Sequence, residues 1–109
     1  MQVRFSSVRL HKLLSDEKSM TKKYGKDASR SVTIRLAHLV AVSNVADLLQ
    51  MPGDWHHLRG NRSGQLAAKI SKSLRLIIMP TRTPPTTAGG TIDWKRVDDI
   101  TLLEVVDYH

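Results

Sequence analysis

The sequence predicts one α+β domain over residues 1–109, with an N-terminal strand and two or three helices packed on one face of an antiparallel sheet of four or five strands. Three observations predict this class. Residues 2–6 alternate between polar and apolar side chains, residues 7–50 carry apolar residues at spacings of three and four, and several short apolar runs separated by Gly and Pro follow. A length of 109 residues suits a single hydrophobic core.

The first strand and the first helical segment occupy residues 2–25. Alternation over residues 2–6 places Val3 and Phe5 on one face of a half-buried strand. A helical stripe follows from residue 7, and Gly25 ends it. Ser15 and Asp16 are expected to break or re-cap this helix. The stripe consists of Leu10, Leu13, Leu14, Met20 and Tyr24.

A second helix is predicted to begin at Asp27, which can cap it through its carboxylate. Ser43 and Asn44 indicate a stop and a new N-cap, so residues 45–50 are expected to add one or two turns. The apolar face of the longer helix is expected to consist of Val32, Leu36, Leu39 and Val40. The Pro-Gly pair at residues 52–53 ends the helical half of the chain.

The second half of the chain predicts strands. Residues 55–59, 65–71 and 74–79 form a predicted antiparallel meander, and residues 100–106 are apolar enough to lie inside the sheet. Residues 81–90 contain Pro-Pro and Gly-Gly pairs and are expected to form a protruding loop. Helices on one face leave the other uncovered, and a cationic face of this kind is a platform for RNA or for a protein partner.

The charge distribution favours a polyanionic partner. The net charge is +7, with 15 basic and 5 acidic residues in positions 1–83 against 2 and 5 in positions 84–109. Nucleic acid is the first candidate, an acidic protein the second and a membrane surface the third. The chain has no cysteine, no signal-peptide core and no apolar run of about 20 residues, so we expect a cytoplasmic protein without a membrane span.

Two stretches combine chemically active side chains. Residues 55–65 hold two imidazoles, two guanidiniums and two glycines, and the chain ends in a carboxylate, a phenol and an imidazole at Asp107, Tyr108 and His109. Both stretches also fit a solvated turn and an inert tail. If residue 106 ends a strand in mid-sheet, the terminal groups reach the sheet edge, where they could meet His56 and Arg59.

No cofactor or metal is expected. The phosphate-binding and dinucleotide glycine patterns and the G-x-S-x-G motif are absent. Adjacent residues of a strand point to opposite faces, so His56 and His57 are poorly placed to chelate one ion. The carboxylates of Asp98, Asp99, Glu104 and Asp107 could bind magnesium, but plain solvation is the more frequent role of such groups.

Together these stretches resemble the HigB group of the RelE/ParE toxin superfamily, the killer proteins of bacterial type II toxin-antitoxin systems. The resemblance spans nearly the whole chain. It is carried by QVRF, LHKLLSDEKSMTKKYG, DLLQMPGDWHHLRGNRSGQ, SLRLIIMP and LLEVVDYH. The patterns H-x-L-[KR]-G-[DN]-R-x-G-Q and V-D-Y-H are the specific ones. Arg59 stands where relatives often have Lys, and Leu66 replaces a frequent Trp.

The resemblance implies a ribosome-dependent, metal-independent mRNA endoribonuclease that a HigA-type antitoxin inactivates, with operator DNA contacted only through the antitoxin. The residues that fall on the family's active-site motifs are His56, Arg59, Arg75, Asp107, Tyr108 and His109. The cations expected to bind RNA are Arg59, Arg62, Lys69, Lys72 and Arg75. Two other functions remain open, a non-catalytic regulator of the same fold and a ParE-like gyrase poison.

The expected chemistry needs no metal. A ribose 2′-OH attacks the adjacent phosphate and leaves a 2′,3′-cyclic phosphate and a 5′-OH, with cations stabilising the extra charge. Arg59 and Arg75 would supply the cations. His109 or Asp107 would be the base, His56 the acid, and Tyr108 would stack on or orient a base of the RNA. The sequence does not decide which residue has which role.

Overall fold

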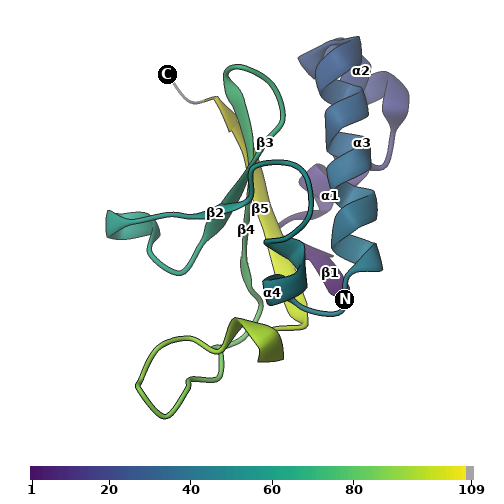
Figure 1. The fold of residues 1–109 in the computed structure, drawn as a ribbon. Helices are drawn as coiled ribbons and strands as arrows, with labels where there is room; N and C mark the ends of the chain where they lie inside the picture. Colours follow the sequence, from purple (N-terminus) through teal and green to yellow (C-terminus); the bar gives the residue numbers. More distant parts are fainter. Residues whose placement is uncertain (108–109) are drawn as a thin grey trace.

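The computed structural model describes residues 1–107 as helices on one side of a five-stranded sheet (Figure 1). The helices are α1 (Val8–Leu14), α2 (Glu17–Tyr24), α3 (Lys26–Ala41) and the single turn α4 (Val45–Leu48). The strands are β1 (Gln2–Phe5), β2 (His56–His57), β3 (Leu66–Lys69), β4 (Leu74–Pro80) and β5 (Asp99–Asp107). Two short 3₁₀ turns, η1 (Gly60–Arg62) and η2 (Trp94–Arg96), lie in the connections.

The sheet has the strand order β1-β5-β4-β3-β2, which confirms the α+β class. Strands β2 to β5 pair antiparallel in sequence order, as expected for a meander. The first strand differs from the prediction, because β1 runs parallel to β5 and the sheet is therefore mixed. The helices between β1 and β2 carry the chain from one edge of the sheet to the other, and β5 then enters between β1 and β4.

The breaks between the helices follow from their caps. The Ser7 hydroxyl accepts from the Leu10 N–H at the start of α1, and the Asp16 carboxylate accepts from the Lys18 N–H at the start of α2, which confirms the expected re-capping. The predicted cap at Asp27 is wrong. Gly25, at φ 92°, is the single residue between α2 and α3. Helix α3 therefore begins at Lys26, and Asp27 lies inside its first turn.

The hydrophobic core lies between the helices and the sheet. Val32 and Leu39 of α3 are fully buried, whereas Val40, expected on the same face, is 64% exposed. A helix turns about 100° per residue, so the position after Leu39 points away from the core. The sheet contributes Leu66, Ala68, Leu76, Ile78, Ile100 and Leu102 to this core. Val3 and Phe5 pack against it, as the alternation predicts.

Two connections differ in detail from their predicted extents. Only His56 and His57 of the predicted strand 55–59 pair with β3, because the chain then turns into η1. Residues 81–98 form a long loop with one isolated bridge between Thr86 and Ile92, and this agrees with the predicted protrusion. In residues 1–107 no helix has the length and apolar character needed to cross a membrane.

Candidate active site

The sheet face opposite the helices carries the candidate site. Leu66, Ala68, Leu76 and Ile78 pack into the core, so the residues between them point to the other side. Figure 1 shows α1, α2 and α3 together on one side of the sheet. We call the other side the open face. It carries His56, Ala67, Lys69, Arg75, Ile77 and Glu104.

Strand register arranges these side chains in two neighbouring rows. The first row is His56, Ala67, Ile77 and Glu104, read from β2 to β5. The second row contains Lys69 opposite Arg75. Directly opposed residues have Cβ atoms roughly 5 Å apart, and diagonal neighbours are roughly 7 to 8 Å apart. Lys69 is therefore a diagonal neighbour of His56, and Arg75 lies one strand further on, beside Lys69.

A turn of unusual backbone conformation fixes the orientation of His56. Gly53 has φ 121° and Asp54 has φ 57°, and the Asp54 carbonyl lies 2.8 Å from His56 Nδ1. A carbonyl oxygen can only accept, so Nδ1 carries a proton and donates it in this bond. In neutral His56 the second nitrogen, Nε2, is then the basic one. The bond persists when Nε2 gains a proton, so the ring keeps its orientation in both states.

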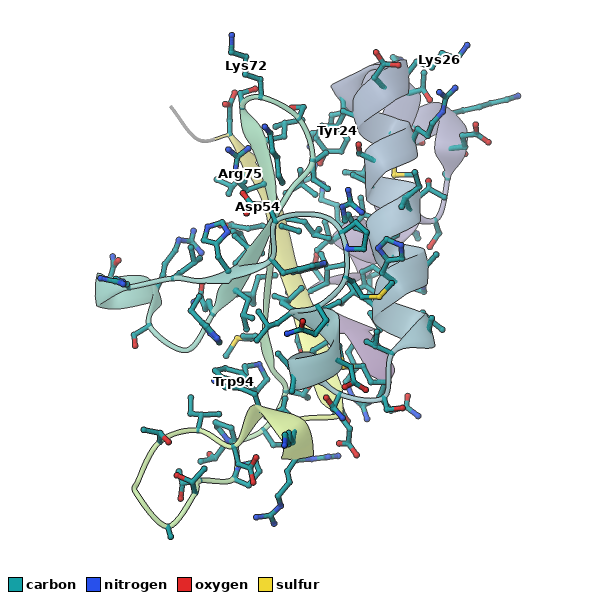
Figure 2. The ribbon with its side chains drawn as sticks, viewed as in Figure 1. Tyr24, Lys26, Asp54, Lys72, Arg75 and Trp94 are labelled. Carbon is teal, nitrogen blue, oxygen red and sulfur yellow. The ribbon has the colours of Figure 1, made fainter. Side chains whose placement is uncertain are left out.

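Arg75 is held by the hairpin between β3 and β4. Its Nη1 donates to the Ser71 carbonyl at 2.8 Å and to the Leu74 carbonyl at 3.0 Å, and the residue is half-buried. These bonds use one of the three guanidinium nitrogens and fix the plane of the group. Lys72, at the same hairpin, is exposed (Figure 2). The hairpin therefore presents an ordered cation beside a solvated one.

The remaining predicted cations differ in their surroundings. Arg59 and Lys69 are exposed. Arg62 instead turns back over the open face, where it pairs with the Glu104 carboxylate and donates to the Gln65 side-chain oxygen at 2.8 Å. This pair lies above Ala67 and Ile77, which are both fully buried although they point away from the core cluster. The Arg62 and Glu104 pair thus covers the middle of the open face. Lys69 and Arg75, for which no ion pair is found among residues 1–107, lie at one end of this face.

The C-terminal group of predicted residues is only partly described. Asp107 ends β5 opposite Leu74, whose side chain packs on the helix side, so register places Asp107 on the face away from Arg75. Strands β4 and β3 lie between β5 and β2, roughly 14 Å across three strand spacings. The structure therefore does not bring Asp107 to His56. Tyr108 and His109 lie outside the described residues.

Two of the four carboxylates considered for magnesium, Asp99 and Glu104, are paired with cations. The side-chain hydrogen bond from Arg4 lowers the pKa of Asp99, and the Thr81 hydroxyl adds to this effect. Glu104 is paired with Arg62. In the part of the chain that the structure describes, no three His, Cys, Asp or Glu side chains are grouped as metal ligands.

The sequence did not reveal the support behind His56. Arg35 of α3 packs over Gly53, where a Cβ atom would lie 2.5 Å from the Arg35 Nε. The Gly53 carbonyl accepts from the Lys69 N–H at 2.8 Å, which joins the turn to the end of β3. The Pro-Gly-Asp sequence at residues 52–54 signals a turn, but nothing in it shows that the turn orients an imidazole.

The comparisons with solved structures define the class of fold as that of the YoeB/ParE toxins. A YoeB/ParE toxin from Agrobacterium tumefaciens matches at TM-score 0.58 and 8% identity, covering all of both chains. A YoeB-YefM complex from Staphylococcus aureus matches at TM-score 0.57 and 16% identity, and a YoeB dimer from the same organism at 0.55 and 17%; each covers all of this chain and 97% of the other. No family model and no curated protein matches the sequence.

Proposed function

We propose that this protein is the toxin of a type II toxin-antitoxin system, a ribosome-dependent mRNA endoribonuclease that works without a metal or cofactor in the cytoplasm, as one domain over residues 1–109. One observation carries the proposal. His56 lies on the open face with Nδ1 bonded to the Asp54 carbonyl and Nε2 available for proton exchange, on the same face as Lys69 and Arg75. The toxin fold and the two specific sequence patterns support the same reading.

The proposed reaction uses these groups as follows. A base removes the ribose 2′-OH proton, the 2′ oxygen attacks phosphorus, and the bond from phosphorus to the 5′ oxygen breaks. Protonated His56 donates its Nε2 proton to the leaving 5′ oxygen, while Arg75 and Arg59 stabilise the charge on the phosphate. The products are a 2′,3′-cyclic phosphate and a 5′-OH. The base is assigned to His109 rather than to Asp107, which register places on the other face of the sheet, and Tyr108 is assigned to orient an RNA base.

We assign the inhibitor to an antitoxin of the HigA type, through which operator DNA would be contacted. A solved structure of similar fold is a two-protein complex, YoeB with YefM, and this supports a protein partner for the chain. HigB identity itself is supported by the motif residues alone, since the structural relatives carry the names YoeB and ParE.

The decisive experiment compares two neighbouring histidines. His56→Gln should lower the rate of cleavage of mRNA programmed into ribosomes by about 10² to 10⁴, because a general acid is lost. His57→Gln is the matched control. His57 is also exposed but lies in the row of buried Leu66, with its ring 4.9 Å from that of Trp94. Its substitution should leave the rate within a few fold, as measured by primer extension.

The same assay separates the alternative functions. Equal rates for the His56→Gln variant and the unaltered chain would remove the imidazole from the mechanism. Growth arrest with broken DNA and intact mRNA would favour a gyrase poison. Intact mRNA and normal growth would favour a non-catalytic regulator.

A further inference from the structure

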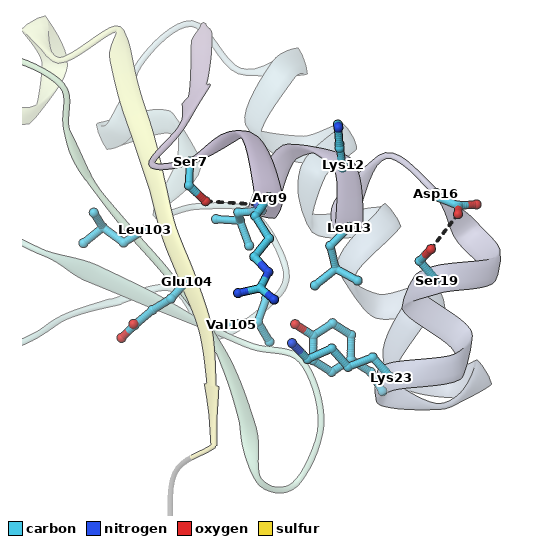
Figure 3. A pocket seen from close by; sticks show the side chains of 12 residues that line it. Ser7, Arg9, Lys12, Leu13, Asp16, Ser19, Lys23, Leu103, Glu104 and Val105 are labelled. Carbon is cyan, nitrogen blue, oxygen red and sulfur yellow. Dashed lines mark hydrogen bonds between the residues drawn. The ribbon is translucent and has the colours of Figure 1, made fainter.

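A hollow lies on the opposite side of β5 from the open face, between that strand and helices α1 and α2 (Figure 3). Its volume is about 530 Å³. The floor is apolar, with Leu10, Leu13 and Val105. Cationic side chains of Arg9, Lys12 and Lys23 stand at the rim.

One wall of the hollow is a strand edge without a neighbouring strand. Strand β1 pairs with β5 only from Asp99 to Leu102, whereas β5 continues to Asp107. The chain leaves this edge at Ser6, whose hydroxyl donates to the Leu103 carbonyl at 2.7 Å. Within residues 1–107 no strand lies along positions 104–107 on this side of β5. An edge of this kind is a template for one more strand.

The charges around the edge are not balanced. Figure 3 shows Arg9 and Lys23 pointing into the hollow toward Val105, while Glu104 points to the other side of β5. Glu104 is paired there with Arg62. The Asp16 carboxylate is occupied by the Lys18 N–H and the Ser19 hydroxyl. Among the described residues, no ion pair joins the three rim cations to an acid.

Tyr24 adds a polar group to the lining of the hollow. It lines the hollow, is half-buried, and its pKa is raised by that burial, so the phenol remains a neutral hydrogen-bond donor. Lys23 Nζ lies 5.7 Å from the centre of the Tyr24 ring. Two cations and a phenolic donor thus converge beside an unpaired strand edge.

We propose that this hollow, which we call the edge groove, binds an extended segment of a partner protein that adds to β5 as a further strand. The segment carries a Glu or Asp that Arg9 and Lys23 bind, with apolar side chains on either side that pack on Leu10 and Leu13. Strand addition supplies the main-chain hydrogen bonds, and the cations select the side chain. Naming this partner as the antitoxin rests on the proposed function, whereas the binding mode does not.

The geometry of a strand sets the spacing of the recognised residues. Alternate residues of an added strand face the same side, so the acid and its apolar neighbours are two residues apart. RNA is a poorer occupant, because phosphate groups cannot pair with the N–H and C=O groups of a strand edge in this alternating way. The open face, which lies across the sheet, remains accessible while the edge groove is filled.

The test uses a seven-residue peptide with capped ends and the sequence Thr-Leu-Thr-Glu-Thr-Leu-Thr. Binding to the full-length protein is followed by NMR, with the expected shifts at residues 103–106 and a Kd below about 1 mM. Replacing the glutamate of the peptide by lysine, or substituting Arg9→Gln and Lys23→Gln together in the protein, should each weaken binding by about tenfold or more. Arg9→Lys should retain most of the affinity.

Backbone pairing is tested with N-methylated peptides. Methyl groups on alternate nitrogens along one edge should abolish binding, and methyl groups on the other edge should leave it intact. Equal effects of the two patterns, an unchanged affinity in the double variant, or no binding at all would overturn the proposal. Binding of hexauridylate at residues 103–106, or self-association through them, would assign the edge groove to RNA or to a second copy.

A cleavage assay keeps the two proposals separate. The Arg9→Gln and Lys23→Gln variant should cut ribosome-bound mRNA at the rate of the unaltered protein, because neither residue lies on the open face. Loss of peptide binding with full cleavage supports both proposals. Peptide binding without any cleavage would retain the edge groove and refute the ribonuclease.

Discussion

The turn that carries His56 should be sensitive to a single methyl group. Gly53 has φ 121°, a backbone conformation that residues other than glycine rarely adopt. A Cβ atom at this position would lie 2.5 Å from Arg35 Nε and 2.8 Å from Arg35 Cδ. Gly53→Ala therefore combines backbone strain of about 1 to 3 kcal/mol with displacement of the flexible end of the Arg35 side chain, which costs about 0.5 to 1.5 kcal/mol. The free energy of unfolding should fall by about 1.5 to 4.5 kcal/mol in total.

Gly25 provides the matched control for the cost of backbone strain. Its φ is also positive, at 92°, but no atom lies within 4 Å of the position its Cβ would take. Gly25→Ala should therefore cost only about 1 to 3 kcal/mol. The difference between the two variants, measured by urea denaturation followed by circular dichroism, isolates the contact with Arg35.

A double-mutant cycle completes the test. Arg35→Ala removes the side chain that the new methyl group would meet, so Gly53→Ala should cost less in that background. The expected coupling is about 0.5 to 1.5 kcal/mol. Equal losses for Gly53→Ala and Gly25→Ala, together with no coupling to Arg35→Ala, would refute the contact as the reason for glycine at this turn.

Three further predictions concern other parts of the molecule. Asp99 has a lowered pKa in the folded state, so its contribution to stability is present above the unfolded value near 3.9 and is lost as pH falls through the folded pKa. Asp99→Asn should therefore lose less stability than the unaltered chain between pH 5 and pH 2 in urea titrations, and equal losses would contradict this role of the carboxylate. Ile78→Ala should lower the unfolding free energy by about 2 to 5 kcal/mol and Val40→Ala by less than about 0.5, because only the first side chain is buried, and similar losses in the same urea measurement would contradict the assigned core. Deleting residues 108–109 removes nothing from the described core and should preserve the circular dichroism spectrum while ribosomal mRNA cleavage falls by about 10² to 10⁴; a folded truncation that cuts at full rate would exclude the tail from the mechanism.

Local sequence signals predict most elements of this fold. Ser7, Asp16 and Gly25 mark helix ends, and the Pro-Gly pair at 52–53 separates the helical half from the sheet. These signals act over a few residues, so they are readable without the rest of the chain. The parallel pairing of β1 with β5 joins residues about 97 positions apart, and no local pattern carries that information.

The candidate site likewise depends partly on local sequence and partly on long-range pairing. The residue types around His56 and Arg75 are visible in the sequence, but their arrangement depends on register across three strands. Arg62, one of the predicted RNA-binding cations, is paired with Glu104, which lies 42 positions later, and only the fold brings the two together. The carbonyl that fixes the His56 ring belongs to the backbone and has no sequence signature.

The place of β5 in the sheet also bears on when the fold is completed during synthesis of the chain. Both β1 and β4 need β5 as their neighbour, and the Arg4 and Asp99 ion pair closes a loop of 95 residues. Contacts this distant form late and slowly, because the intervening chain must be ordered first. A nascent chain therefore cannot assemble the open face until the segment 99–107 has been made. A cell that degrades or stalls the unfinished chain would meet a polypeptide in which β2, β3 and β4 lack the strand that joins them to β1. His56 and Arg75 would then stand on three strands without Glu104 and without the core residues Ile100 and Leu102.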